Sequence, residues 1–413
     1  MSARPSLAGR LCQLAPLMRY EENIAMYQVH CLNNIAKVGT DRLGEGFSLT
    51  DEFEAANAIM VRSASLHDIE LPSDLLAIAR AGAGVNNIPI EQCAEQGVVV
   101  FNTPGANANA VKEMVLSGML LAARDVVGGI EWVKENSDDP NIGKQAEKAK
   151  KDFAGTELAG KNLGVIGLGA IGAMVANAGR SLGMHVYGYD PYLSIKYAWS
   201  LDRHVRNVAS LNDIFANCDY ISIHVPANEK TKGMIGRDEI AAMKDGVVLL
   251  NYARDVLVDE IAVSEALQTG HIHRYMTDFA NSVTTQMKHA VVTPHLGAST
   301  KEAEDNCAIM AADELRDYLL YGNIENSVNF ERVNLGPITS GVRIALFHKN
   351  IPTMIGQITG LISEANVNID NMSDKSRGSV AYSLIDITGE VDDTLVERLA
   401  AIDGVIRVRI LRG

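Results

Sequence analysis

Short apolar runs alternate with amphipathic stretches along most of the chain. Apolar runs bounded by turn residues are typical of buried strands, and their alternation with helical patterns predicts βα units and parallel sheets. A first block begins with strand-like residues 27–31 and continues with predicted strands at 58–61, 76–79 and 98–101.

A second alternating block follows a mostly apolar predicted helix, 113–128, and a charge-rich surface connection, 131–151. A long amphipathic helix is predicted behind this block, at 301–320. The elements predicted within the block are the helix 170–182 and the strands 162–166, 185–189, 220–224, 247–251 and 290–293.

The rhythm changes near the C-terminus. Residues 335–341 are rich in Gly, Pro and Ser, which predicts a linker. The order strand, helix, strand, strand, helix, strand then follows at 343–348, 352–365, 367–373, 379–388, 392–401 and 405–411. This βαββαβ order is that of the ferredoxin-like split unit.

The composition is typical of a soluble globular protein with several domains: 47% of the 413 residues are hydrophobic and 21% are charged. The net charge of -14 argues against a general nucleic-acid surface, and no apolar run is long enough to span a bilayer. The cysteines at 12, 31, 93, 218 and 307 form no CxxC pair, so we interpret them as reduced thiols of a cytoplasmic protein.

The N-terminal residues need a separate interpretation. Residues 2–19 contain three arginines and no acidic residue, a composition that resembles an organelle transit peptide. We favour instead a disordered extension over residues 1–25, before Met26, at which translation could also begin.

The sharpest local motif is G-L-G-A-I-G at 167–172, between a predicted strand and a predicted helix. In this context Gly167 allows a tight turn, Gly169 lets the backbone approach a pyrophosphate, and Gly172 lets helix and strand pack closely. The N–H groups at the helix start then face the phosphates. The alternative is a glycine turn that only connects the two elements.

An acidic residue supports the nucleotide interpretation. Asp190 ends the next predicted strand, 18 residues after Gly172. A carboxylate there accepts hydrogen bonds from ribose hydroxyls and repels a 2′-phosphate, which favours NAD over NADP.

Three downstream segments complete a series with the glycine motif: N-Y-A-R at 251–254, T-D-F at 277–279 and T-P-H-L-G at 293–297. Their order resembles the signature motifs of the D-2-hydroxy-acid dehydrogenases. The resemblance runs from about Tyr27 to the C-terminus. Within that family the chain is most similar to the members that oxidise D-3-phosphoglycerate.

The chemistry of a 2-hydroxy acid requires a base for the hydroxyl proton and a fixed cation for the carboxylate. His295 is the candidate base, and Arg254 can grip the carboxylate with its guanidinium fork. In isolation His295 could be a packed loop histidine and Arg254 a surface ion pair. The resemblance further implies cofactor contacts from Ala170, Ile171, His224, Val225, Pro226, Ala253, Asp278 (to the nicotinamide carboxamide) and Gly297.

One departure from the family concerns the carboxylate that usually hydrogen-bonds the catalytic histidine. Residues 279–294 contain no Asp or Glu, and Asp255 replaces the usual glycine after the arginine. Three interpretations remain open. Asp255 or Glu260 orients His295, or the histidine works without a carboxylate partner, or activity is weakened or lost.

Early loops match segments that face the substrate in the family. Arginine and serine side chains would hold anionic groups, and successive backbone N–H groups would bind the carboxylate. The alternative is ordinary turn chemistry of Gly and Asn. The expected substrate contacts are Arg62, Ser63, Ala83, Gly84, Val85, Asn107 and Arg254.

These observations predict two Rossmann-like, doubly wound parallel-sheet domains and a C-terminal ferredoxin-like α+β domain. A discontinuous substrate-binding domain, 26–124 and 295–334, would flank an NAD-binding domain, 125–294. The linker 335–341 and a regulatory domain, 342–413, would follow. The active site would then lie in the cleft between the first two domains.

The C-terminal segment resembles an ACT domain, a ligand-sensing module, through H-K-N-I-P beginning at His348 and V-N-I centred on Asn368. In related architectures the matching positions bind L-serine across a subunit interface. The resemblance therefore implies that His348, Asn350 and Asn368 hold an L-serine effector, although Thr353 replaces a usual glycine. The alternative is a module used only for assembly.

The leading hypothesis is NAD-dependent oxidation of D-3-phosphoglycerate to 3-phosphohydroxypyruvate, the first step of L-serine biosynthesis. The alternatives are another D-2-hydroxy-acid dehydrogenase or 2-oxoacid reductase, and a non-catalytic NAD-sensing regulator. We expect a phosphorylated 2-hydroxy acid as substrate and a homodimer or homotetramer. No metal and no nucleic-acid or membrane partner is expected.

Overall fold

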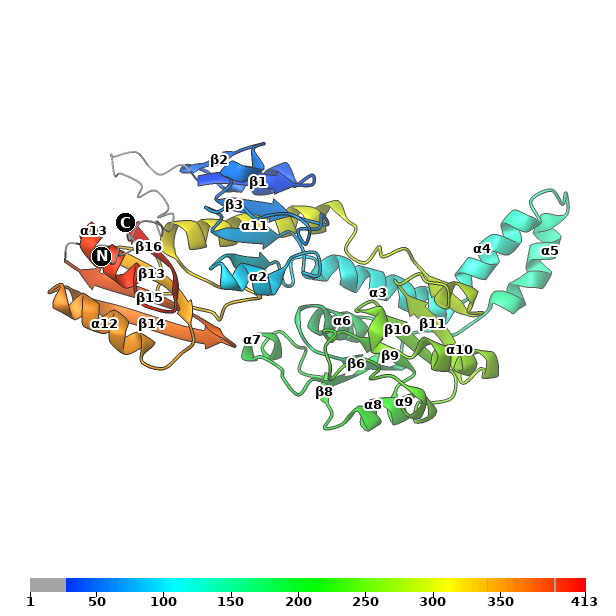
Figure 1. Cartoon of the computed structure of the whole chain (residues 1–413). Coiled ribbons are helices and arrows are strands. Elements are labelled where there is room, and N and C mark those ends of the chain that lie inside the picture. The colour runs from blue at the N-terminus through cyan, green and yellow to red at the C-terminus, as the bar shows by residue number, and fades with distance from the viewer. Residues whose placement is uncertain (1–26, 340, 390) are drawn as a thin grey trace, which may run out of the picture.

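The computed structural model describes residues 27–339, 341–389 and 391–413, so the extension expected over residues 1–25 lies outside it. The described residues form three β-sheets with helices packed against them (Figure 1). Two of these sheets are parallel throughout and the third is antiparallel, which confirms the predicted fold class.

The first sheet has the strand order β2-β1-β3-β4-β5. Helix α11 (Lys301–Tyr321) returns from far along the chain to cover this sheet (Figure 1). Gly39 permits its close contact with α1, because an added Cβ there would lie 2.5 Å from the Cβ of Ala308. The other elements are β1 (Tyr27–Leu32), α1 (Lys37–Arg42), β2 (Phe47–Leu49), η1 (Phe53–Ala55), β3 (Ala58–Val61), β4 (Ala77–Arg80), α2 (Ile90–Glu95) and β5 (Val99–Asn102).

The second sheet has the order β12-β11-β10-β9-β6-β7-β8, so the strand order reverses between β6 and β9, the usual place of a nucleotide in doubly wound sheets. Helix α3 (Ala108–Ala123) runs from the first sheet and packs on α6, β10 and β11. The elements are β6 (Asn162–Ile166), α6 (Ala170–Ser181), β7 (His185–Tyr189), α7 (Ile195–Ala198), β8 (Arg206–Asn207), α8 (Leu211–Asn217), β9 (Tyr220–Ile223), α9 (Arg237–Ala241), β10 (Val247–Asn251), η3 (Asp255–Leu257), α10 (Glu260–Thr269), β11 (Ile272–Thr277), η4 (Thr284–Gln286) and β12 (Ala290–Val292).

The connection between the two sheets differs from the prediction. A helix was expected over 113–128, but α3 ends at Ala123 because Arg124 is extended and the Asp125 carboxylate accepts a hydrogen bond from the Gly128 N–H at 3.1 Å, which begins a new helix. The expected surface connection is a helical hairpin that projects from the body (Figure 1). It consists of α4 (Val126–Glu135), α5 (Ile142–Ala149) and η2 (Lys150–Phe153).

The third sheet is antiparallel, with the order β14-β15-β13-β16. Its chain order confirms the predicted βαββαβ arrangement, and α12 and α13 pack on one face. The elements are β13 (Val342–Lys349), α12 (Met354–Glu364), β14 (Asn368–Arg377), β15 (Val380–Thr388), α13 (Asp393–Ala400) and β16 (Val405–Arg412).

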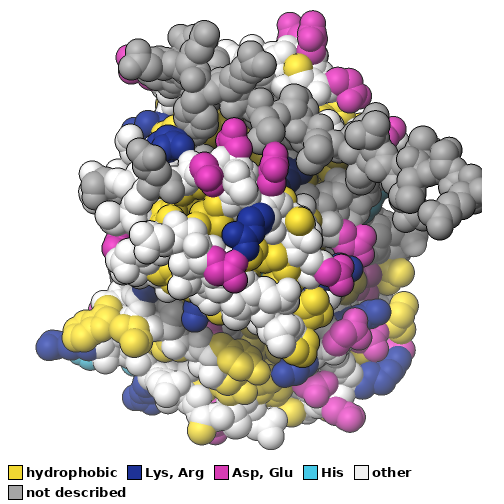
Figure 2. All heavy atoms as spheres, turned by 60° about the vertical axis from the view of Figure 1, so that its left-hand side comes forward, with side chains coloured by type: hydrophobic (Ala, Val, Ile, Leu, Met, Phe, Trp, Pro, Cys, Tyr) yellow, Lys and Arg dark blue, Asp and Glu magenta, His cyan; other side chains and the backbone are white. Residues whose placement is uncertain are grey.

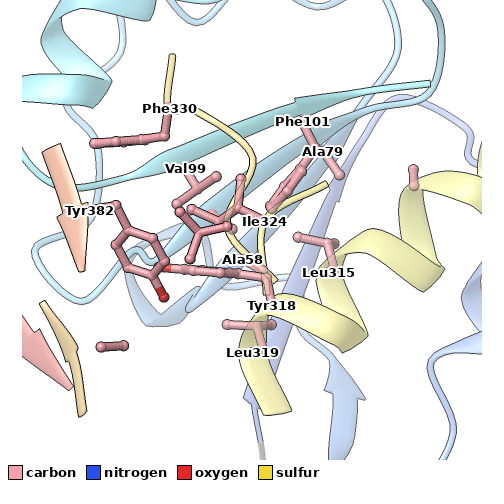
Figure 3. Close-up of a cluster of buried hydrophobic side chains, with 14 of the residues drawn as sticks. Ala58, Ala79, Val99, Phe101, Leu315, Tyr318, Leu319, Ile324, Phe330 and Tyr382 are labelled. Carbon is pink, nitrogen blue, oxygen red and sulfur yellow. The ribbon is translucent and has the colours of Figure 1, made fainter. Parts of the chain in front are cut away.

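The other face of the third sheet shares a hydrophobic core with the first sheet (Figure 3). Phe347 of β13 is fully buried, with its ring centroid 4.9 Å from that of Phe330 and 4.4 Å from that of Tyr382. In the same cluster the Tyr318 ring of α11 lies 5.7 Å from Phe101 of β5. The third sheet is therefore packed firmly against the first, despite the intervening segment that composition marked as a linker.

Charge is dispersed on the surface around the third sheet. Figure 2, which turns this side of the molecule toward the viewer, shows acidic and basic side chains interspersed with apolar areas. Across the described residues, no helix combines the length and apolarity needed to cross a membrane.

Candidate active site

The glycine turn between β6 and α6 lies where the strand order of the second sheet reverses. Gly167 has a φ of +90°, and a Cβ on Gly172 would lie 1.8 Å from the Gly167 carbonyl oxygen. A Cβ on Gly169, in contrast, would meet nothing within 4 Å. Gly167 and Gly172 thus serve the turn itself, whereas Gly169 leaves space for an approaching phosphate, and Ala170 and Ile171 begin the helix behind it.

Asp190 holds this turn from the end of β7. Its Oδ2 accepts a hydrogen bond from the Leu168 N–H at 2.8 Å, and its Oδ1 accepts one from the Tyr192 N–H at 2.8 Å. The carboxylate therefore lies beside the glycine turn.

The loop after β9, which continues to Pro226, also borders the turn. A Cβ on Gly167 would lie 2.5 Å from the His224 carbonyl oxygen and 2.9 Å from a methyl group of Val225. The His224 Nε2 lies 2.8 Å from the Ser222 Oγ, and burial lowers the pKa of His224 to about 3. A neutral imidazole next to the turn adds no charge to a nucleotide site.

A cavity of about 190 Å³ lies at the carboxyl end of the first sheet. It brings together Arg62, Asn107 and His295, which were predicted from separate segments of the sequence. The Asn107 amide, at the start of α3, makes no hydrogen bond with any other described residue. It is therefore available to a ligand in the cavity.

Three guanidinium groups surround this region. Arg62 pairs with Glu304 at 2.6 Å, and the Arg80 Nε donates to the Arg62 carbonyl oxygen at 3.0 Å. The Arg254 Nη2 lies 3.4 Å from the Cβ position of Gly84, and its Nη1 donates to the Ala253 carbonyl oxygen. Burial, and then the neighbouring Arg254 and Arg62, lower the pKa of Arg80. Such crowding of cations favours an anionic ligand.

Two loops present backbone groups toward the same region. The Asn33 Oδ1, held at a φ of +74°, accepts hydrogen bonds from the N–H groups of Arg62, Ser63 and Ala64 at 3.3, 3.0 and 2.9 Å. In the second loop the N–H groups of residues 83–85 donate to no described residue. Successive N–H groups without a partner are available to an anion, the role predicted for these residues.

His295 sits on a constrained loop. Its φ is +56°, unusual for a residue with a side chain, and its N–H donates to the Asp278 carbonyl oxygen at 3.0 Å. The buried Asp278 carboxylate accepts three hydrogen bonds, from the Thr293 hydroxyl at 2.6 Å, the Leu296 N–H at 2.7 Å and the Gly297 N–H at 2.6 Å. Asp278, expected at the nicotinamide carboxamide, thus anchors the loop that carries His295.

Neither alternative carboxylate reaches His295. The Asp255 Oδ1 accepts from the Val256 N–H, and both Glu260 carboxylate oxygens accept from the Asn281 amide at 3.0 and 2.9 Å. The His295 imidazole makes no hydrogen bond within the described chain. Its ring packs edge-on against Phe279, with centroids 5.4 Å apart. The structure therefore does not support orientation of His295 by Asp255 or Glu260.

The effector candidates are not gathered in one place. His348 is buried, with its Nε2 3.0 Å from an Asp374 oxygen, and the nearby Asn350 donates to the Gly378 carbonyl oxygen. His348 pairs with Ala381 of β15 but Asn368 with Thr388, so the two are offset along the strands by about 24 Å at about 3.4 Å per residue. One chain therefore does not bring Asn368 to the other two candidates.

Sequence reasoning missed several residues of the cavity. Arg80, Glu304 and Cys307 line it but were not predicted. Arg80 is the last residue of β4, and the carboxyl end of a parallel strand is where ligands bind, so its position was an available signal. In the part of the chain that the structure describes, no three His, Cys, Asp or Glu side chains form a metal-binding group.

Comparison with known proteins identifies the relationship. Residues 116–297 match the family model of the D-isomer specific 2-hydroxyacid dehydrogenase NAD-binding domain. The D-3-phosphoglycerate dehydrogenase of Escherichia coli is 32% identical over 359 residues, which cover 83% of each protein. The enzyme of that name from Methanocaldococcus jannaschii is 33% identical over 81% of this chain, and the chain spans 63% of its length; for the Mycobacterium leprae enzyme this share is 59%.

A solved structure agrees with these relatives. The NAD⁺-bound 3-phosphoglycerate dehydrogenase of Entamoeba histolytica aligns with a TM-score of 0.59 and 26% identity, covering 75% of this chain and all of that one. The sequence relatives, the family model and the shared architecture agree. The chain therefore belongs to the D-isomer specific 2-hydroxyacid dehydrogenase family.

Proposed function

We propose that the chain oxidises D-3-phosphoglycerate to 3-phosphohydroxypyruvate with NAD. The observation that carries this proposal is the grouping of Arg62, Arg80 and Arg254 around the region that His295 lines. A substrate with both a carboxylate and a phosphate needs more cationic groups than an unphosphorylated hydroxy acid. The names of the relatives support the same substrate.

In this mechanism Arg254 binds the substrate carboxylate and polarises the bond at the reacting carbon. His295 accepts the hydroxyl proton at its imidazole, while bound NAD supplies the hydride acceptor. Arg80 and Asn107 are assigned to the phosphate, and Asp278 keeps the His295 loop in place. The free space at Gly169 accommodates the pyrophosphate, and Asp190 takes the ribose.

The formation of NADH, measured by its absorbance, tests the proposal. The wild-type chain should turn over D-3-phosphoglycerate, His295→Asn should reduce kcat by roughly 10²–10⁴-fold, and the exposed-histidine control His204→Asn should not. Turnover restricted to unphosphorylated hydroxy acids would assign another dehydrogenase. NAD binding without turnover would assign a non-catalytic regulator, an alternative favoured by the unpartnered His295 imidazole.

We further propose a homodimer or homotetramer of cytoplasmic location whose third sheet is an ACT domain that binds L-serine. The separation of Asn368 from His348 fits a site completed by a second copy. Val126, Ile130 and Val133 leave an exposed apolar stripe on the projecting α4, which supports self-association. Sedimentation tests the assembly. L-serine should inhibit turnover of the wild type but not of Asn368→Ala, which tests the proposed effector site.

A further inference from the structure

A second cavity, of about 680 Å³, lies further along α11 from the cavity that His295 lines. The helix contributes residues from Asn306 to Asp317, the loop after β5 contributes Gly105 and Ala106, and the segment 323–326 closes the end. No residue of this cavity lines the first one. The two cavities are therefore separate sites on one helix.

Every charged side chain that lines this cavity is acidic. Two of the carboxylates are already paired with arginines: Asp313 with Arg42 at 2.7 Å, and Glu325 with Arg332 at 2.6 Å. The remaining two, Glu314 and Asp317, accept hydrogen bonds only from neutral amides, those of Asn326 at 2.6 Å and Asn323 at 2.9 Å. Neither of these two carboxyl groups therefore has a cationic hydrogen-bond partner among the described residues.

Glu314 supplies an independent indication of a ligand. The side chain lines the cavity although the residue is only 8% exposed. Its Oε1 accepts the Asn326 hydrogen bond, but its buried Oε2 has no partner among the described residues. An unsatisfied buried carboxylate oxygen is costly, and native structures rarely retain one without a reason.

The remaining lining defines the shape of the ligand. Phe101, Ile309 and Met310 provide apolar surface beside the carboxylates. The described residues hold no group of acidic, cysteine or histidine side chains suited to a metal ion. An ammonium or guanidinium group on a short apolar body matches both features, because it donates hydrogen bonds to carboxylates while its carbon atoms cover the apolar wall.

From this geometry we infer a second ligand site, in which Glu314 and Asp317 bind the head of a small organic cation. The inference does not depend on the proposed dehydrogenase activity. Burial raises the pKa of Glu314 to about 8, so the free carboxyl is largely protonated at pH 7. A cation that binds beside it should therefore displace close to one proton.

Isothermal titration of the full chain with n-butylammonium and n-butylguanidinium chlorides, in two buffers of different ionisation enthalpy, tests this site. At least one cation should bind saturably to one site and release close to one proton at pH 7, while 1-butanol should not bind. Glu314→Gln keeps the contact with Asn326 and should weaken binding by roughly 10–100-fold and abolish the proton release. Asp317→Asn should also weaken binding, and the exposed carboxylate control Asp41→Asn should not.

Three results would overturn the inference. The first is that neither cation binds the wild type at millimolar concentration. The second is that 1-butanol binds as well as the cations, and the third is that Glu314→Gln and Asp317→Asn both leave the affinity unchanged. Thermal unfolding of Glu314→Gln establishes that the variant is folded. If Glu314→Gln is unfolded, the proton release of the wild type and the cation affinity of Asp317→Asn test the site in its place.

Discussion

The Asp278 carboxylate offers the sharpest test of how the loop that carries His295 is held. In Asp278→Asn, the amide oxygen can replace only one carboxylate oxygen, and the amide NH₂ then opposes either the Gly297 N–H or the Leu296 N–H. At least one charged hydrogen bond is lost and a donor faces a donor. We expect the loop to lose about 1.5–3 kcal/mol of local stability, the usual worth of a hydrogen bond to a charged group.

Two measurements follow this loss. Hydrogen exchange of the Leu296 and Gly297 amides should accelerate by roughly 10–100-fold, and kcat should fall by a similar factor because the His295 imidazole is no longer held in place. Thr293→Val, which removes one of the three hydrogen bonds and keeps the carboxylate, should show a smaller effect on both. Unchanged exchange together with a kcat within about twofold of the wild type would refute the reasoning. Weaker NAD binding with unchanged hydrogen exchange would instead indicate that Asp278 contacts the nicotinamide carboxamide.

The other predictions concern the cofactor turn, a buried acid and the shared core. Gly169→Ala should leave thermal stability unchanged, since the added Cβ meets nothing within 4 Å, but should weaken NAD binding by roughly tenfold or more; unchanged affinity would contradict the phosphate role. The carboxyl pKa of Glu314 is raised from 4.5 to about 8 in the folded chain, so the free energy of unfolding should fall as the pH rises from 4.5 to 8, with a slope on the order of 1 kcal/mol per pH unit. Urea unfolding of Glu314→Gln should not show this pH dependence. Phe347→Ala should cost about 3–5 kcal/mol and increase hydrogen exchange in α11 as well as in the third sheet; an effect confined to the third sheet would argue against a shared core.

Much of the fold could be predicted because its elements carry local signals. The glycine turn of residues 167–172 has its strand before it and its helix behind it, and the βαββαβ order of the C-terminal segment follows from alternating periodicity. The end of α3 could not be placed, since apolar residues continue past Ala123 and only the Asp125 cap reveals the new helix. Periodicity records which residues are apolar and carries little information about caps.

The site was predicted less completely, and for a different reason. The structure brings Arg62, Asn107 and His295 to one cavity but does not bring Asn368 to His348, because side-chain partners depend on tertiary contacts. The sequence could not show that the Glu260 carboxylate would accept hydrogen bonds from the Asn281 amide, or that Asp278 would accept hydrogen bonds from the loop that carries His295. Nor could composition show that the third sheet would bury Phe347 against the first, because the same apolar strand could have faced a partner.

Helix α11 connects the three regions on which the predictions depend. Its first turns line the cavity that His295 also lines, its middle turns place Glu314 at the second cavity, and its last turns place Tyr318 in the core shared with the third sheet. Close-packed interiors transmit displacement and do not absorb it, so a shift of the third sheet must move this helix or open a void beside it. The described residues of the connection to the third sheet, 335–339 and 341, line neither cavity. A ligand on the third sheet that alters turnover should therefore act through α11, and Phe347→Ala, which loosens the packing at that junction, should reduce its effect on turnover more than its affinity.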